Sequence, residues 1–143
     1  MHPDDHLDHL KGVYSILAPG GRYLVLVPHR FSGPHDVSWV FGEDRAVGMH
    51  LKEYTYKEMI EACKSAGFRS VYVFPPTKLR KIIALISGKN SWLKNNLEAS
   101  YGKVLVLLER ALFLIPNDPL PKPLKFLVEK SKLFPCPLFI AQK

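Results

Sequence analysis

Three things are scarce or missing in this sequence: cysteine, long apolar runs and the Gly-x-Gly motif. Cys63 and Cys136 are too few for a disulfide-stapled secreted scaffold, and they do not form a Cys-x-x-Cys pair. The most apolar stretch, residues 104–115, is broken by Glu109 and Arg110, which makes it too short and too charged to cross a bilayer. The chain opens without a basic region and an apolar run, so no signal peptide is visible. We therefore expect a cytoplasmic protein in a reducing compartment.

The length and the charge distribution indicate one domain with a basic second half. A chain of 143 residues with a hydrophobic fraction of 47% can bury a core of its own. Residues 1–75 hold 8 Lys and Arg against 9 Asp and Glu, whereas residues 76–143 hold 12 against 4. This asymmetry favours an anionic partner or surface for the second half, although a solvated basic face explains the same count.

Residues 3–28 have the pattern of a helix followed by a strand. Pro3 and the two acidic residues after it suit a first helical turn. Apolar residues then recur at helical spacing on one face: Leu7, Leu10, Tyr14 and Leu17. Pro19-Gly20-Gly21 ends the helix, and residues 22–28 form a nearly continuous apolar run of strand length. Such a run predicts a strand covered on both faces, as in a parallel α/β sheet.

A long loop and a second helix–strand pair follow. Residues 29–54 show no regular pattern, and loops of that length often form lids or binding sites. Thr55 with Glu58 three positions later predicts a capping box at the start of a helix that ends at Gly67. Residues 68–74 predict the second strand.

The second half is predicted to be mainly helical. Residues 78–88 and 98–115 have helical patterns, and a short basic helix is expected at residues 124–133, beyond a proline-rich segment. A last strand is expected at residues 135–140, starting at an edge because of its prolines.

Several segments, taken in order, resemble one known family. Leu17-Ala18-Pro19-Gly20-Gly21 opens the first strand, and His2-Pro3-Asp4-Asp5 precedes it. His50-Leu51-Lys52-Glu53-Tyr54-Thr55 opens a helix, and Ala66-Gly67-Phe68 opens the second strand. This series resembles the second half of a class I S-adenosylmethionine-dependent methyltransferase, with the closest likeness to the group called methyltransferase type 11. In that family the first turn leads into the fifth strand of a seven-stranded sheet, and residues 137–142 would be the antiparallel seventh strand.

The resemblance implies a fold and a function. The fold would be α/β, a partial Rossmann-like methyltransferase sheet made of the last three strands. It would form one partial domain over residues 1–143, with a helical, basic insertion at residues 76–134 before the final strand. The function would be methyl transfer from S-adenosylmethionine to a small-molecule or lipid-like acceptor.

The cofactor-binding half of that family has no counterpart here. The family holds S-adenosylmethionine with a Gly-rich loop after the first strand and an acidic residue at the end of the second. We therefore leave the cofactor-binding residues unknown. We expect a chain that is inactive alone, as a fragment, a truncated product or a subunit completed by a partner chain. The strand at residues 22–28 would then present an unpaired apolar edge. The alternative function is a non-catalytic binding or peripheral membrane module derived from a methyltransferase remnant.

Four polar residues follow the first strand, where open α/β sheets bind ligands. They are His29, Arg30, His35 and Asp36. An acceptor that must lose a proton needs a base, and a histidine near neutral pKa suits that task. We predict His29 as the first candidate base and His35 as the second, with Arg30 and Asp36 binding the acceptor. Solvated loop residues beside a Gly-Pro turn would give the same pattern.

Three further candidates precede the second helix. The resemblance places His50, Glu53 and Tyr54 near the acceptor pocket, where Tyr54 could supply a hydroxyl and Glu53 a carboxylate. Packing at the entry to the helix is the alternative interpretation.

The N-terminal histidines and acids superficially suggest a metal cluster. The set comprises His2, Asp4, Asp5, His6, Asp8 and His9. The acids sit where the start of a helix favours negative charge, and neither a cysteine nor another convergent ligand supports a site. We therefore predict no metal site.

The basic residues of the second half lie beside apolar ones. Lys78, Arg80 and Lys81 precede an apolar helical stretch, and residues 78–133 as a whole could rest on an anionic membrane surface. An insertion that packs its apolar face on the sheet would show the same pattern. We predict no nucleic-acid partner, because neither a recognisable module nor a row of aromatic residues accompanies the charge.

Overall fold

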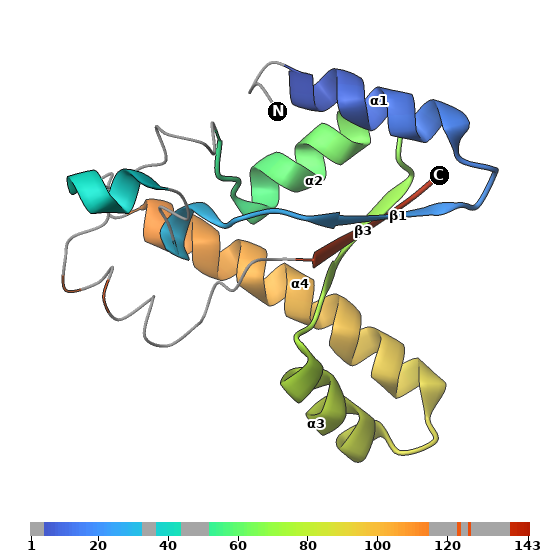
Figure 1. The fold of residues 1–143 in the computed structure, drawn as a ribbon. Coiled ribbons are helices and arrows are strands. Elements are labelled where there is room, and N and C mark those ends of the chain that lie inside the picture. Colours follow the sequence, from blue (N-terminus) through green and yellow to red (C-terminus); the bar gives the residue numbers. More distant parts are fainter. Residues whose placement is uncertain (1–4, 33–36, 44–51, 115–122, 124–125, 127–137) are drawn as a thin grey trace.

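The computed structural model describes residues 5–32, 37–43, 52–114, 123, 126 and 138–143. These residues form a small α/β fold with four α-helices and a three-stranded sheet (Figure 1). The helices are α1 (His6–Ile16), α2 (Tyr56–Ser65), α3 (Thr77–Ser87) and α4 (Ser91–Phe113), and the strands are β1 (Arg22–Leu26), β2 (Ser70–Phe74) and β3 (Leu138–Gln142). Two 3₁₀ turns, η2 (Arg30–Ser32) and η3 (Val37–Phe41), lie in the long loop after β1.

The sheet places the last strand in the middle. Its order is β1-β3-β2, and β3 pairs antiparallel with both neighbours, so β1 and β2 run in the same direction without pairing. Phe139 lies opposite Val25 on one side and Val73 on the other. An antiparallel last strand is thus confirmed at residues 138–142, within the 137–142 that the resemblance implies and later than the 135–140 expected from the sequence pattern.

The prediction that β1 is covered on both faces is wrong for the described residues. Val25 is buried, whereas Leu24 and Leu26, which point to the other face, are 61% and 68% exposed. A continuous apolar run is compatible with either arrangement, because side-chain direction alternates along a strand whatever the side chains are. Of the described strands only β3 pairs with β1, so the other edge of β1 has no partner among them.

The core lies between the buried face of the sheet and the helices packed on it. Phe139 and Ala141 of the central strand are fully buried, together with Cys63 of α2. α1 and α2 pack on each other, and both α2 and α4 contact β2. Leu105 of α4 belongs to the same apolar cluster, so α4 is part of the core.

The local signals around α2 are confirmed. Thr55 caps the helix and forms the predicted capping box with Glu58. Gly67 follows the helix with a φ of +107°, a value that side-chain-bearing residues rarely adopt. The edge of the Tyr14 ring would lie about 3.1 Å from a Cβ at this position, so α1 also depends on glycine here.

The helices of the second half form a hairpin. α3 packs on α4, and α3 together with the first part of α4 extends away from the sheet toward the bottom of Figure 1. α4 begins at Ser91, seven residues before the predicted start, because the Asn90 side chain accepts a hydrogen bond from the Leu93 amide at 3.0 Å and caps the helix. The predicted basic helix at 124–133 lies outside the described residues except for isolated positions. Within the described part of the chain, no helix combines the length and apolar character that a transmembrane span requires.

Candidate functional site

The end of β1 and the start of α2 are joined through their main chains. The Arg30 amide donates to the carbonyl of Tyr54 at 3.2 Å, and the Tyr54 amide donates to the carbonyl of Pro28 at 3.1 Å. These bonds form a parallel bridge between His29 and Tyr54. Two segments that the sequence separates by a long loop therefore lie side by side, at the carboxyl end of β1.

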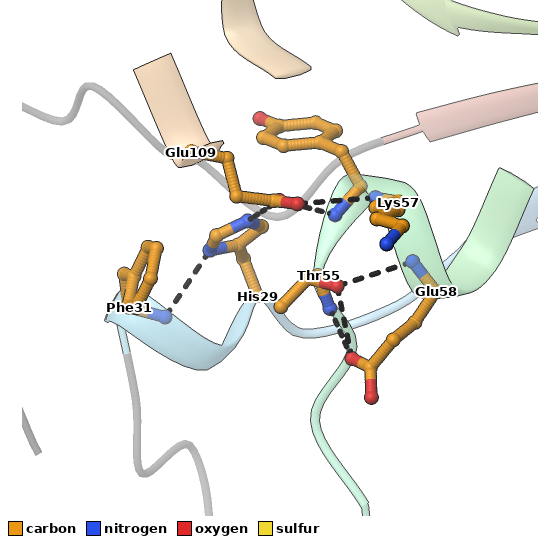
Figure 2. Close-up of polar contacts among 7 residues, drawn as sticks. His29, Phe31, Thr55, Lys57, Glu58 and Glu109 are labelled. Atoms are coloured by element: carbon orange, nitrogen blue, oxygen red, sulfur yellow. Dashed lines mark hydrogen bonds and ion pairs between the residues drawn. The ribbon is translucent and has the colours of Figure 1, made fainter. Parts of the chain in front are cut away.

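The imidazole of His29 is fully buried at this junction and engaged at both nitrogens (Figure 2). Its Nδ1 accepts a hydrogen bond from the Phe31 amide at 3.2 Å, so the ring proton is assigned to Nε2. Nε2 lies 3.3 Å from a carboxylate oxygen, Oε2 of Glu109, to which it donates. In this tautomer neither ring nitrogen has a free lone pair, so His29 cannot take a proton from a methyl-acceptor molecule.

The carboxylate of Glu109 also caps α2, although Glu109 is far from α2 in the sequence. Its Oε2 accepts from the Tyr56 amide at 2.5 Å and its Oε1 from the Lys57 amide at 3.2 Å. A carboxylate at a helix N-terminus satisfies amides that have no partner within the helix and complements the helix dipole. Glu109 is fully buried, so these contacts and His29 replace its hydration.

The capping box completes the polar contacts at the start of α2. The Thr55 amide donates to Glu58 Oε2 at 2.9 Å, and the Glu58 amide donates to the Thr55 hydroxyl at 3.1 Å. With Glu109 on the next two amides, every backbone amide from 55 to 58 has an acceptor. The N-terminus of α2 is therefore already filled by carboxylates of the chain itself.

Tyr54 lies beside this polar core. Its ring makes an edge contact with the His6 ring of α1 at 5.6 Å between centroids, and Lys52 Nζ lies 5.0 Å from its centroid. Burial, with a further contribution from the nearby Glu58 charge, raises the pKa of the Tyr54 hydroxyl above its ordinary value. Tyr54 therefore stays protonated at neutral pH.

The structure brings four of the predicted site residues together and describes no others. His29 and Arg30 lie across the parallel bridge from Tyr54, and Glu53 directly precedes it. Glu53 is buried at 9% exposure, rather than lining an open surface. The remaining predicted residues, His35, Asp36 and His50, lie outside the described residues.

The role of Glu109 is not evident from the sequence pattern alone. The residue was noted only as an interruption of an apolar run, yet it is the group that joins α4 to α2 and His29. A single acid inside an amphipathic helix next to Leu105 and Leu108 was the available signal, because a carboxylate there must either reach solvent or find buried donors.

The described residues do not fit a bound S-adenosylmethionine. The helix start beside the carboxyl end of β1 is filled by Glu109, and the sequence has no Gly-x-Gly motif that would let a backbone approach the cofactor. A cavity of about 620 Å³ lies at the opposite ends of the strands; it is lined by Tyr14, Pro19, Gly20, Arg69, Ser70, Gln142 and Lys143. Among the residues described, no three His, Cys, Asp or Glu side chains converge as metal ligands.

Comparison with known proteins identifies no relative. Neither the family models, nor the curated proteins, nor the solved structures include a match to this chain.

Proposed function

We propose that this chain is the acceptor-side part of an S-adenosylmethionine-dependent methyltransferase, with a small-molecule or lipid-like acceptor. The observation that carries the proposal is the sheet order. β1 and β2 run in one direction, and the last strand lies antiparallel between them. The segments that resemble the family lead into these elements: the Pro-Gly-Gly turn into β1, the Thr55-capped helix into β2, and residues 138–142 into the antiparallel strand.

The residues divide into positioning and acceptor-facing groups under this proposal. His29 is a positioning residue rather than a base, because it is buried and donates to Glu109. It fixes the segment directly after β1, and His35 and Asp36 come after that segment in the sequence. His35 then remains the candidate base for an acceptor that must lose a proton. Tyr54 supplies a hydroxyl donor next to that segment.

The cofactor half must come from outside the described residues. We propose that it is supplied by another segment or by a partner chain, because the described helix start at this edge is filled internally.

The competing function is a non-catalytic binding module built on the same remnant fold. The same observation favours it, since a closed helix start is what a chain without a cofactor would also have.

Calorimetric titration with S-adenosylhomocysteine tests the proposal, after circular dichroism and gel filtration show a folded, monodisperse chain. We expect the chain alone not to bind S-adenosylhomocysteine. Micromolar binding would overturn the proposal that the chain lacks the cofactor-binding half. The source gene is then read upstream of Met1 for an in-frame Gly-rich motif after a strand pattern. A longer product carrying it is expected to bind S-adenosylhomocysteine and to transfer a labelled methyl group. Failure of both the chain and the longer product to bind leaves the non-catalytic module as the function.

A further inference from the structure

The α3–α4 hairpin carries exposed apolar side chains along α3 and at the start of α4. Ile82, Leu85 and Ile86 of α3 are 53%, 84% and 65% exposed, and their spacing places them on one helical face. Trp92, in the first turn of α4, is 73% exposed. Ile83, on another side of α3, is buried, so the orientation of the helix is set and the outer face is left open.

Basic side chains accompany these apolar residues in the sequence. Lys78, Lys81 and Lys89 are exposed, and residues 77–97 contain no Asp or Glu. Arg80 is not part of this set, because its guanidinium lies over the Phe74 ring at 4.4 Å. The outer face of the hairpin therefore combines apolar and cationic side chains with no acidic residue among them.

We propose that this face, Ile82, Leu85, Ile86 and Trp92 with Lys78, Lys81 and Lys89, docks on the surface of an anionic lipid bilayer. Apolar side chains of an interfacial helix enter the boundary between headgroups and acyl chains, while lysines bind the anionic headgroups. Tryptophan favours the same interfacial depth. The charge of the face complements an anionic membrane leaflet. Binding to the phosphates of a nucleic acid would involve the lysines but not the apolar side chains. The proposal is independent of methyl transfer, because lipid binding is measured without cofactor.

Vesicle co-sedimentation of the full chain tests the charged part. We expect binding to phosphatidylcholine vesicles that contain phosphatidylserine, weaker binding to vesicles that lack it, and loss of binding in high salt. The variant Lys78→Gln/Lys81→Gln/Lys89→Gln should bind more weakly by roughly fivefold per lysine. The matched control Lys11→Gln/Lys64→Gln/Lys103→Gln removes the same charge from exposed positions elsewhere and should bind as the parent does. Equal loss in the two variants would overturn the proposal.

The apolar part has its own pair of variants. Leu85→Ser/Ile86→Ser should lower the partition coefficient by roughly tenfold or more. Ile16→Ser/Leu24→Ser changes residues that are 83% and 61% exposed outside the hairpin, and should leave it unchanged. All four side chains are exposed, so both variants should keep the parent circular dichroism spectrum and unfolding midpoint.

Trp92 reports insertion directly. In a Trp39→Phe background it is the remaining tryptophan of the chain. Its emission should shift to the blue on addition of phosphatidylserine vesicles and should be quenched by brominated lipids. A blue shift that instead appears without lipid as protein concentration rises, together with a dimer in gel filtration, would show that a second copy covers the face and would overturn the proposal. Loss of lipid binding would leave the titration with S-adenosylhomocysteine unaffected, so the two proposals fail separately.

Discussion

His29 and Glu109 lie 80 positions apart in the sequence and meet in the core, with Nε2 3.3 Å from Oε2 and both side chains almost completely buried. Glu109 also holds the first amides of α2. One carboxylate thus joins the segment after β1, the start of α2 and the C-terminal part of α4. α4 is therefore joined to the core by a buried polar group as well as by its apolar side chains.

Removing the Glu109 carboxylate should destabilise the fold strongly. Glu109→Ala leaves His29 and two helix amides without their acceptor in the core, and should lower the free energy of unfolding by about 3–5 kcal/mol. Glu109→Gln keeps one acceptor oxygen but turns an amide group toward the remaining donor, and should cost about 1–3 kcal/mol. Urea denaturation followed by circular dichroism measures both. Glu61→Gln, at a residue 62% exposed on α2, is the control and should change little.

A double-mutant cycle should show that His29 and Glu109 act together. His29→Ala, Glu109→Ala and the double variant should give a coupling free energy of roughly 1–3 kcal/mol, because the buried pair shares one hydrogen bond. The exposed pair Lys57 and Glu61, 3.8 Å apart, should give a coupling below about 0.5 kcal/mol. Similar coupling for the two pairs would refute the role assigned to His29 as a positioning residue.

The two side-chain caps should differ in strength. Thr55→Ala removes a buried hydroxyl that accepts from the Glu58 amide and donates to its carboxylate, and should cost about 2 kcal/mol. Asn90→Ala removes one exposed cap at the start of α4 and should cost about 0.5–1 kcal/mol. Unfolding midpoints of the two variants make the comparison. The larger loss at Asn90 would mean that α2 is held by Glu109 rather than by its own capping box.

Glycine substitutions should change stability in opposite directions. Gly67→Ala forces a side chain onto a φ of +107° and toward Tyr14, and should cost about 2–3 kcal/mol. Gly12→Ala lies within α1, where nothing would lie within 4 Å of the new Cβ, and should add about 0.5–1 kcal/mol. Thermal and urea unfolding measure both changes. A neutral Gly67→Ala would show that the packing of α1 against the end of α2 is looser than described.

Stability should fall in mild alkali because of Cys63. Burial raises the pKa of the Cys63 thiol from 9.0 to about 11, so the folded chain keeps a proton that the unfolded chain releases. The stabilisation is complete below about pH 9 and is lost as the pH rises toward 11. Urea unfolding across this range should show the decline, and the Cys63→Ala variant should show a smaller one.

Two tyrosines limit the pH range over which the parent and Cys63→Ala can be compared without other titrating groups. Burial raises the pKa of Tyr101, as it does that of Tyr54, and both begin to contribute with the same sign near pH 10. The difference between parent and Cys63→Ala is therefore read below that pH. In a Cys136→Ser background, thiol labelling provides a second readout. Cys63 should react slowly at pH 8 until urea unfolds the chain, and rapid labelling of the folded chain would contradict its burial.

Local features of the fold could be predicted from the sequence. The Thr55–Glu58 capping box and the glycine after α2 depend on residues within one helical turn of each other, and both are present in the structure. The predicted start of α4 was too late, although Leu93 and Leu97 have helical spacing and Asn90 provides a cap before them. The open face of β1 was missed because an apolar run does not report which side is covered.

The candidate site was predictable only in part. His29 is predicted because it follows the first predicted strand, and Tyr54 because the family resemblance places it near the acceptor pocket; the structure joins their main chains. Their environment was not predictable, because burial of the His29 ring depends on a helix eighty positions away.

The turns, the Thr55–Glu58 capping box, the α/β class and the concentration of basic charge in the second half follow from the sequence, because they depend on neighbouring residues or on composition. Only the tertiary structure decided that β3 lies between β1 and β2, that Glu109 fills the start of α2, and that one face of the α3–α4 hairpin stays open. These features are set by which distant surfaces pack together. A buried carboxylate is stable only where distant donors converge on it, and no local pattern encodes that convergence.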